Sequence, residues 1–98
     1  MAVIRTTRLE VPPENAEELL ARRAALVAAV RAAHPGLTGT RLARVDERTF
    51  VDTWTWDSAA SLHRALDAVF DIPEAGPAFA LTEATTLDVE QADVVDER

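Results

Sequence analysis

The 98-residue chain contains no cysteine, no lysine and no tyrosine, and these absences narrow what it can be. Without cysteine it can form neither a disulfide framework nor a thiolate metal site, which fits a reducing compartment. Its longest wholly apolar run is Ala24–Val30, far short of the about 20 residues that a membrane-spanning helix needs. Strand-like residues begin at Ala2, which leaves no room for a signal peptide. We therefore expect a cytoplasmic protein that does not associate with membranes.

Positive charge is also scarce, because the only basic residues besides two histidines are 10 arginines and the formal net charge is −7. A negative field disfavours nucleic acid as a partner, and we ascribe the acidic charge to solubility. The histidines, His34 and His63, are far apart in the sequence, and no His-x-x-x-His pair or carboxylate cluster accompanies them. The sequence therefore predicts neither a metal site nor a bound cofactor.

The apolar share of 48% is typical of a globular protein, and the length fits a single domain over residues 1–98. Runs of β-forming residues predict strands, and apolar residues at helical spacing predict helices. The predicted strands are Ala2–Val11, Leu37–Val45, Thr49–Trp56 and Thr85–Val95, and the predicted helices run from Asn15 to about Ala33 and from about Ala59 to Phe70. The prolines and glycine within Ile72–Leu81 predict a loop there with room for one helical turn.

Helix starts and buried faces can be predicted as well. Asn15, with Glu18 three residues later, fits a capping box, whereas Pro13 could instead be the first helical residue. Asp57 and Ser58 are expected to cap the second helix. The predicted buried stripe of the first helix is Ala16, Leu19, Leu20, Ala24, Val27 and Val30.

The order β-α-β-β-α-β predicts an α+β, ferredoxin-like fold, in which a four-stranded antiparallel sheet carries two helices on one face. In the third strand, Phe50, Asp52, Trp54 and Trp56 alternate with Val51, Thr53 and Thr55. We expect the first set to lie under the helices and the second to face outward. A bare sheet face with β-branched and apolar residues is uncommon on monomers, which predicts a homodimer formed through the sheet.

Three segments carry a family resemblance: VPPENAEEL at residues 11–19, HPGL at 34–37 and WTWDSAA at 54–60. They resemble the antibiotic biosynthesis monooxygenase family of dimeric α+β barrels, many of whose members end strand three with a tryptophan just before a capped helix. The resemblance implies enzymes that oxidise aromatic substrates with O₂ and no metal or flavin. Such an enzyme encloses its substrate between sheet and helices and stabilises the deprotonated form, which itself reduces O₂.

The resemblance suggests which residues to examine. Trp56 matches the family tryptophan and could donate its indole N–H in a pocket, or it could pack in the core with that N–H satisfied. Asp52 would be partly desolvated between Phe50 and Trp54, which suggests a base. The alternative for Asp52 is an ion pair with an arginine of a neighbouring strand, namely Arg5, Arg41 or Arg44.

His63 follows Leu62 directly, whereas many family members have a histidine three residues after the matching leucine, where this chain has Ala65. Arg5 could bind an anionic substrate group, with plain surface charge as the alternative. Our candidate catalytic residues are Asp52, Trp56 and His63, and our candidate substrate-binding residues are Phe50, Trp54, Phe79 and Arg5. The aromatic members of this set could instead simply fill the space under the helices.

Two departures from the family pattern concern function. The proton-donating tyrosine of some family oxygenases is missing, and no asparagine lies in the first strand, which argues against haem degradation. The leading expectation is a cofactor-independent monooxygenase that acts on a hydrophobic aromatic or polyketide-like small molecule. The alternatives are a non-catalytic small-ligand-binding protein, an isomerase or cyclase on the same fold, and a structural homodimer.

Overall fold

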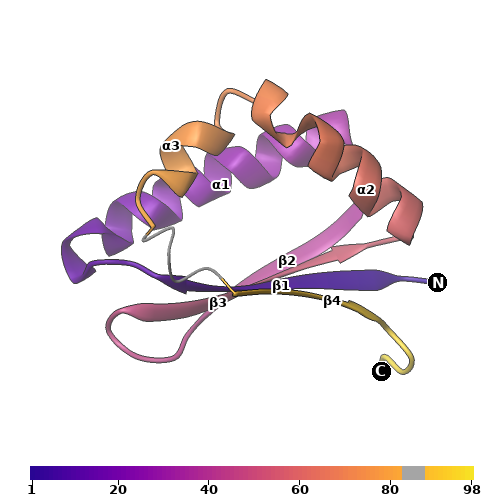
Figure 1. Ribbon diagram of the computed structural model, residues 1–98, viewed down its shortest axis with the longest axis horizontal. Helices are drawn as coiled ribbons and strands as arrows, with labels where there is room; N and C mark the ends of the chain where they lie inside the picture. The colour runs from indigo at the N-terminus through magenta and orange to yellow at the C-terminus, as the bar shows by residue number, and fades with distance from the viewer. Residues whose placement is uncertain (83–87) are drawn as a thin grey trace.

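A computed structural model describes residues 1–82 and 88–98 of the chain. These residues form the strands β1 (Val3–Glu10), β2 (Leu37–Arg44), β3 (Thr49–Trp56) and β4 (Asp88–Asp93) and the helices α1 (Ala16–Ala33), α2 (Ala59–Ala68) and α3 (Ala75–Phe79). The antiparallel sheet has the order β2-β3-β1-β4, and the helices all lie over one of its faces (Figure 1). This is the predicted ferredoxin-like arrangement.

The element boundaries follow the sequence signals closely. β3 has the predicted bounds, and α3 is the helical turn expected within Ile72–Leu81. A 3₁₀ turn, η1 (Pro13–Asn15), leads into α1, and a second, η2 (Val69–Asp71), follows α2. The start predicted for the last strand, Thr85, lies outside the described residues.

The capping prediction fails at the start of α1 and holds at the start of α2. Asn15 makes no side-chain capping hydrogen bond, so the capping box is wrong and Pro13 opens the helical segment instead. At α2 the side chain of Ser58 accepts a hydrogen bond from the backbone N–H of Ser61 at 3.1 Å, as predicted.

The β2–β3 turn is held by Asp46. Its carboxylate accepts hydrogen bonds from the backbone N–H groups of Arg48 and Thr49, at 2.9 and 2.8 Å. These hydrogen bonds hold the pKa of Asp46 below its ordinary value, and the bond from Arg48 contributes most. The closed turn keeps β2 and β3 antiparallel, which fixes the side that each β3 side chain faces.

Strand register decides which residues lie under the helices. β1 pairs with β3 so that Val3 lies opposite Trp56 and Leu9 opposite Phe50, and all four side chains are buried. The even-numbered side chains of β3 therefore face the helices, as predicted. A β-bulge between Leu37 and Gly39 shifts the alternation in β2 by one residue.

The buried side chains form two clusters, one toward each end of β1. The Trp56 cluster is made of Val3, Leu26, Val30, Leu37, Trp56, Leu62, Ala65, Ala75 and Ala78. The Phe50 cluster is made of Leu9, Val11, Ala16, Leu19 and Phe50. The helix-facing residues of β3 between the two clusters are Asp52 and Trp54.

The buried face of α1 differs from the predicted stripe. Leu20 is 54% exposed and Ala24 is also exposed, whereas Leu26 is buried. The buried face instead centres on Arg23, which is only partly exposed and lies one helical turn from both Leu19 and Val27. The predicted stripe, which omits Arg23 and Leu26, is therefore rotated relative to the side of α1 that faces the core.

Candidate functional site

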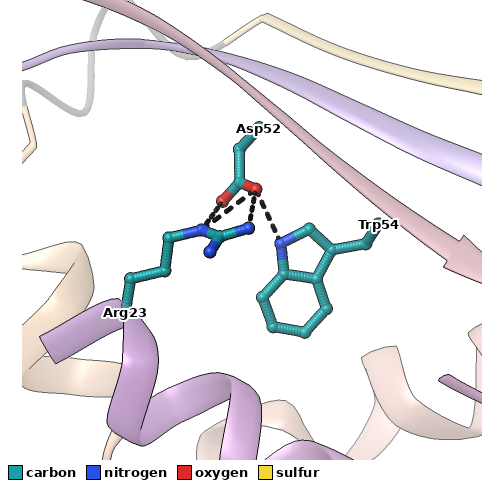
Figure 2. Close-up of polar contacts among 3 residues, drawn as sticks. All are labelled: Arg23, Asp52 and Trp54. Atoms are coloured by element: carbon teal, nitrogen blue, oxygen red, sulfur yellow. Dashed lines mark hydrogen bonds and ion pairs between the residues drawn. The ribbon is translucent and has the colours of Figure 1, made fainter. Parts of the chain in front are cut away.

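The most distinctive group of side chains joins α1 to the middle of β3. The carboxylate of Asp52 accepts hydrogen bonds from Arg23 Nη2 at 2.8 Å and from Arg23 Nε at 3.2 Å to each oxygen. The indole Nε1 of Trp54 donates to Asp52 Oδ1 at 2.9 Å. Figure 2 shows the guanidinium and the indole meeting the carboxylate side by side.

This ion pair is largely removed from solvent. The side chains of Arg23 and Asp52 are 16% and 13% exposed. A charge-assisted pair with little solvent competition is stronger than a surface pair, and each partner depends on the other to offset its lost hydration. Asp52 therefore fixes the side chains of Arg23 and Trp54 in the space between the Trp56 and Phe50 clusters.

The partner of Asp52 is not one of the arginines that the sequence suggested. Arg41 is exposed, and the guanidinium of Arg44 lies 5.1 Å from the centre of the Phe50 ring. The ion-pair interpretation of Asp52 is thus confirmed, but its partner comes from α1. The signal that could have identified Arg23 is its place at helical spacing between Leu19 and Val27.

The hydrogen bonds also limit what Asp52 can do as a base. Among the described residues, Oδ1 accepts hydrogen bonds from both side chains, whereas Oδ2 accepts one, from Arg23 Nε at 3.2 Å. Oδ2 is thus the oxygen with room for a second donor. Asp52 can take a substrate proton at this open position on Oδ2 while the hydrogen bond from Arg23 Nε remains.

Trp56, unlike Asp52, has a polar group that is buried without a hydrogen bond among the described residues. Its side chain is buried in the Trp56 cluster with the residue only 3% exposed, and its indole Nε1 has no hydrogen-bond partner among the described residues. Most buried polar groups in native proteins are paired, and leaving one unpaired costs about 1–3 kcal/mol. The ring packs in the core, but the N–H is a free, desolvated donor.

Arg5 lies on the same helix-facing side. In the strand register it is opposite Trp54 on β3 and Gln91 on β4. The side chain is partly buried, and this burial lowers the pKa of its guanidinium from the ordinary value. Within residues 1–82 and 88–98 the guanidinium of Arg5 makes no hydrogen bond or ion pair.

The remaining candidates lie at different distances from this centre. Phe50 is buried in the cluster named after it. Phe79 is 43% exposed on α3, and His63 is exposed on α2. The structure thus brings Asp52, Trp54 and Arg5 together between Phe50 and Trp56, and it leaves His63 at the surface.

Two surface hollows lie elsewhere. One, of about 160 Å³, lies between α1 and α3 and is lined by Arg22, Ala25, Pro73, Glu74 and Pro77. The other, of about 270 Å³, lies where α1 ends and is lined by Ala33, His34, Pro35, Gly36, Ser61 and Arg64. Neither hollow is lined by a predicted site residue. In the described part of the chain, no three His, Asp or Glu side chains are grouped to hold a metal ion, and no helix is long and apolar enough to cross a membrane.

Solved structures with the same fold include an oxygenase. SnoaB, a cofactor-independent oxygenase from Streptomyces nogalater, has 23% identity and a TM-score of 0.72, with 98% of this chain and 95% of SnoaB covered. A protein of unknown function from Nitrosomonas europaea has 16% identity and a TM-score of 0.71, with 99% and 92% covered. At these identities the likeness shows the fold alone.

The comparison with family models identifies the family as well as the fold. No curated protein matches the chain. Residues 2–69, from β1 through the whole of α2, match the model described as antibiotic biosynthesis monooxygenase. This segment includes Arg5, Arg23, Asp52, Trp54 and Trp56, so the candidate site lies inside the matched region. The chain belongs to the antibiotic biosynthesis monooxygenase family.

Proposed function

We propose that the protein is a cofactor-independent monooxygenase that acts on a hydrophobic aromatic or polyketide-like small molecule. The site is the helix-facing region around Trp56, Asp52 and Trp54. The observation that carries this proposal is the buried indole N–H of Trp56, which has no partner among the described residues. Membership of a family described as monooxygenases supports the reaction class.

A free buried donor suits the reaction's need. Removing a proton from an electron-rich aromatic ketone places negative charge on its oxygen as an enolate. A fixed donor in apolar surroundings stabilises such an oxygen more than water does, because it needs no reorganisation as the charge develops. The Trp56 side chain belongs to a buried cluster with Val3, Leu37 and Leu62, which provides such surroundings.

The remaining steps can be assigned to the substrate, O₂ and Asp52. Oδ2 of Asp52 accepts the substrate proton, and the resulting carbanion passes an electron to O₂ and then combines with the reduced oxygen. The peroxide formed at carbon loses water, so that a CH₂ group becomes C=O. One oxygen atom enters the product and the other leaves as water, and the substrate supplies the electrons.

Oxygen uptake with anthrone as the probe tests the proposal. We expect the protein to accelerate O₂ consumption and to form anthraquinone with one O₂ consumed per product. Anthraquinone itself, which has no CH₂ group left to oxidise, should cause no uptake. A rate no higher than the spontaneous rate in buffer with heat-denatured protein would contradict the proposal.

A second function is favoured by a separate observation. Asp52 is already held by Arg23 and Trp54, an arrangement that suits a rigid binding site as well as a catalytic one. A non-catalytic binding protein would show a thermal shift with an aromatic ligand and no product. An isomerase or cyclase would form product without O₂ uptake, and a structural homodimer would show neither shift nor product.

We also propose that the chain pairs with a second copy through the sheet face that its helices leave uncovered. Ile4 and Thr6 of β1 and Val51, Thr53 and Thr55 of β3 are only partly exposed there, and they are apolar or β-branched. Light scattering at micromolar concentration is expected to give the mass of a dimer. A monomeric mass under these conditions would contradict the pairing.

A further inference from the structure

We propose that the ligand of this site is an aromatic molecule bearing an anionic oxygen group, a carboxylate or an ionised phenol, and that Arg5 binds this group. The inference rests on the proposed function, because it names the substrate class for the same site. It starts from the position of Arg5 in the sheet, directly opposite Trp54 and on the side that the helices cover.

No carboxylate of the described residues forms an ion pair with Arg5. Asp52 lies opposite Thr7, two residues along β1 from Arg5 and on the same face of the sheet, but it is engaged by Arg23. The residue opposite Arg5 on β4 is the neutral Gln91. Asp93 also faces the helix side, opposite Val3 and two residues along β1 from Arg5, and it is exposed.

A local surplus of positive charge therefore exists in a chain whose net charge is −7. Of the described residues, two guanidinium groups, Arg5 and Arg23, share this region with one partly buried carboxylate, that of Asp52. Since Arg23 and Asp52 neutralise each other, the surplus resides on Arg5. A partly buried cation without a partner favours an anion that replaces its lost hydration.

The kind of anion follows from the chemistry of the two neighbouring side chains. A guanidinium presents a planar set of donors that matches a carboxylate or another anionic oxygen. Burial lowers the pKa of Arg5, but an arginine stays protonated at neutral pH. The Trp54 indole, fixed by its hydrogen bond to Asp52, lies opposite Arg5 and provides a ring for an aromatic ligand to contact.

Two probes of matched shape test the inference by calorimetry, with no need for turnover. 2-Naphthoate carries a carboxylate, and 2-naphthamide is its neutral counterpart. We expect the protein to bind the naphthoate about tenfold more tightly or better, as charge-assisted hydrogen bonds are worth more than neutral ones. Arg5→Gln should remove this preference while leaving naphthamide affinity within about twofold, and Arg5→Lys should restore part of it.

Arg31→Gln is the matched control, because it removes the same charge from the chain at an exposed position of α1. This variant should keep the preference for naphthoate, which separates a local contact from the effect of net charge. Circular dichroism establishes that each variant is folded.

Three results overturn the inference alone. One is equal affinity of the unaltered protein for the two probes, and another is a preference that survives in Arg5→Gln; in both of these cases an aromatic ligand still binds and the proposed function stands. Binding of neither probe by a protein that oxidises anthrone also overturns the inference alone. Failure to bind either probe, together with failure to oxidise anthrone, overturns the inference and the proposed function together.

Discussion

Asp52→Leu is expected to lower the free energy of unfolding by about 3–5 kcal/mol, as breaking a buried ion pair does when one charge is left without its partner. The guanidinium of Arg23, only 16% exposed, would lose the carboxylate that binds it through Nε and Nη2. The Trp54 indole N–H would lose its acceptor in the same substitution. Urea denaturation followed by circular dichroism measures the change.

The double variant Arg23→Met/Asp52→Leu should recover most of this loss. Apolar side chains of similar volume remove both desolvated charges at once, which in other proteins is neutral or stabilising by about 1–4 kcal/mol. An equally unstable double variant would show that the loss comes from packing rather than from the stranded charge.

The ion pair between Arg22 and Glu18 on the same helix is the matched control. Arg22 Nη2 lies 3.4 Å from Glu18 Oε1, but the side chains of Arg22 and Glu18 are 52% and 54% exposed. Arg22→Gln should therefore change stability by only about 0.3–0.5 kcal/mol. A comparable loss at both pairs would contradict the view that burial makes Asp52 critical.

Strand β3 was predictable in both its bounds and its orientation. Its alternation places large aromatic residues on one side and β-branched residues on the other, and only the first set suits a covered face. The same period also predicted that Asp52 shares this face with Phe50 and Trp56. The part of the site that lies on one strand could thus be derived from the sequence.

The contact between Arg23 on α1 and Asp52 on β3 could not be derived from the sequence. Nothing local in the sequence links residue 23 to residue 52, because their contact exists only after α1 has packed across the sheet. The predicted stripe of α1 includes Leu20 and Ala24, which are exposed, and omits Leu26 and Arg23, which lie on the core side. Had Arg23 been accepted as part of the buried face, a carboxylate partner on the sheet would have been required.

The β-bulge in β2 also could not be predicted from the sequence. Leu37 and Leu42 are five positions apart, so strict alternation would place them on opposite faces. The bulge between Leu37 and Gly39 brings both to the helix side, where Leu37 pairs with Trp56 and Leu42 with Asp52. Such a bulge depends on pairing with β3, and the residue types of β2 alone do not indicate it.

Trp56→Phe is expected to reduce kcat for anthrone oxidation by about 10²–10³, the usual effect of removing one donor to a developing oxyanion. KM should change little, because the hydrogen bond strengthens mainly as charge develops in the transition state. The indole N–H has no partner to lose among the described residues of the free protein. The cost in stability should therefore be confined to the smaller ring, about 1–2 kcal/mol.

Trp54→Phe gives the contrasting result that makes the test specific. The Trp54 N–H is already donated to Asp52 at 2.9 Å, so its removal should destabilise the protein by about 1.5–3 kcal/mol, the value of a hydrogen bond to a charged group. Its effect on kcat should be smaller than that of Trp56→Phe, since this N–H is not free to reach a substrate. If Trp56→Phe keeps the kcat of the unaltered protein, the ring serves only to fill the Trp56 cluster, and the oxyanion role assigned to its N–H is wrong.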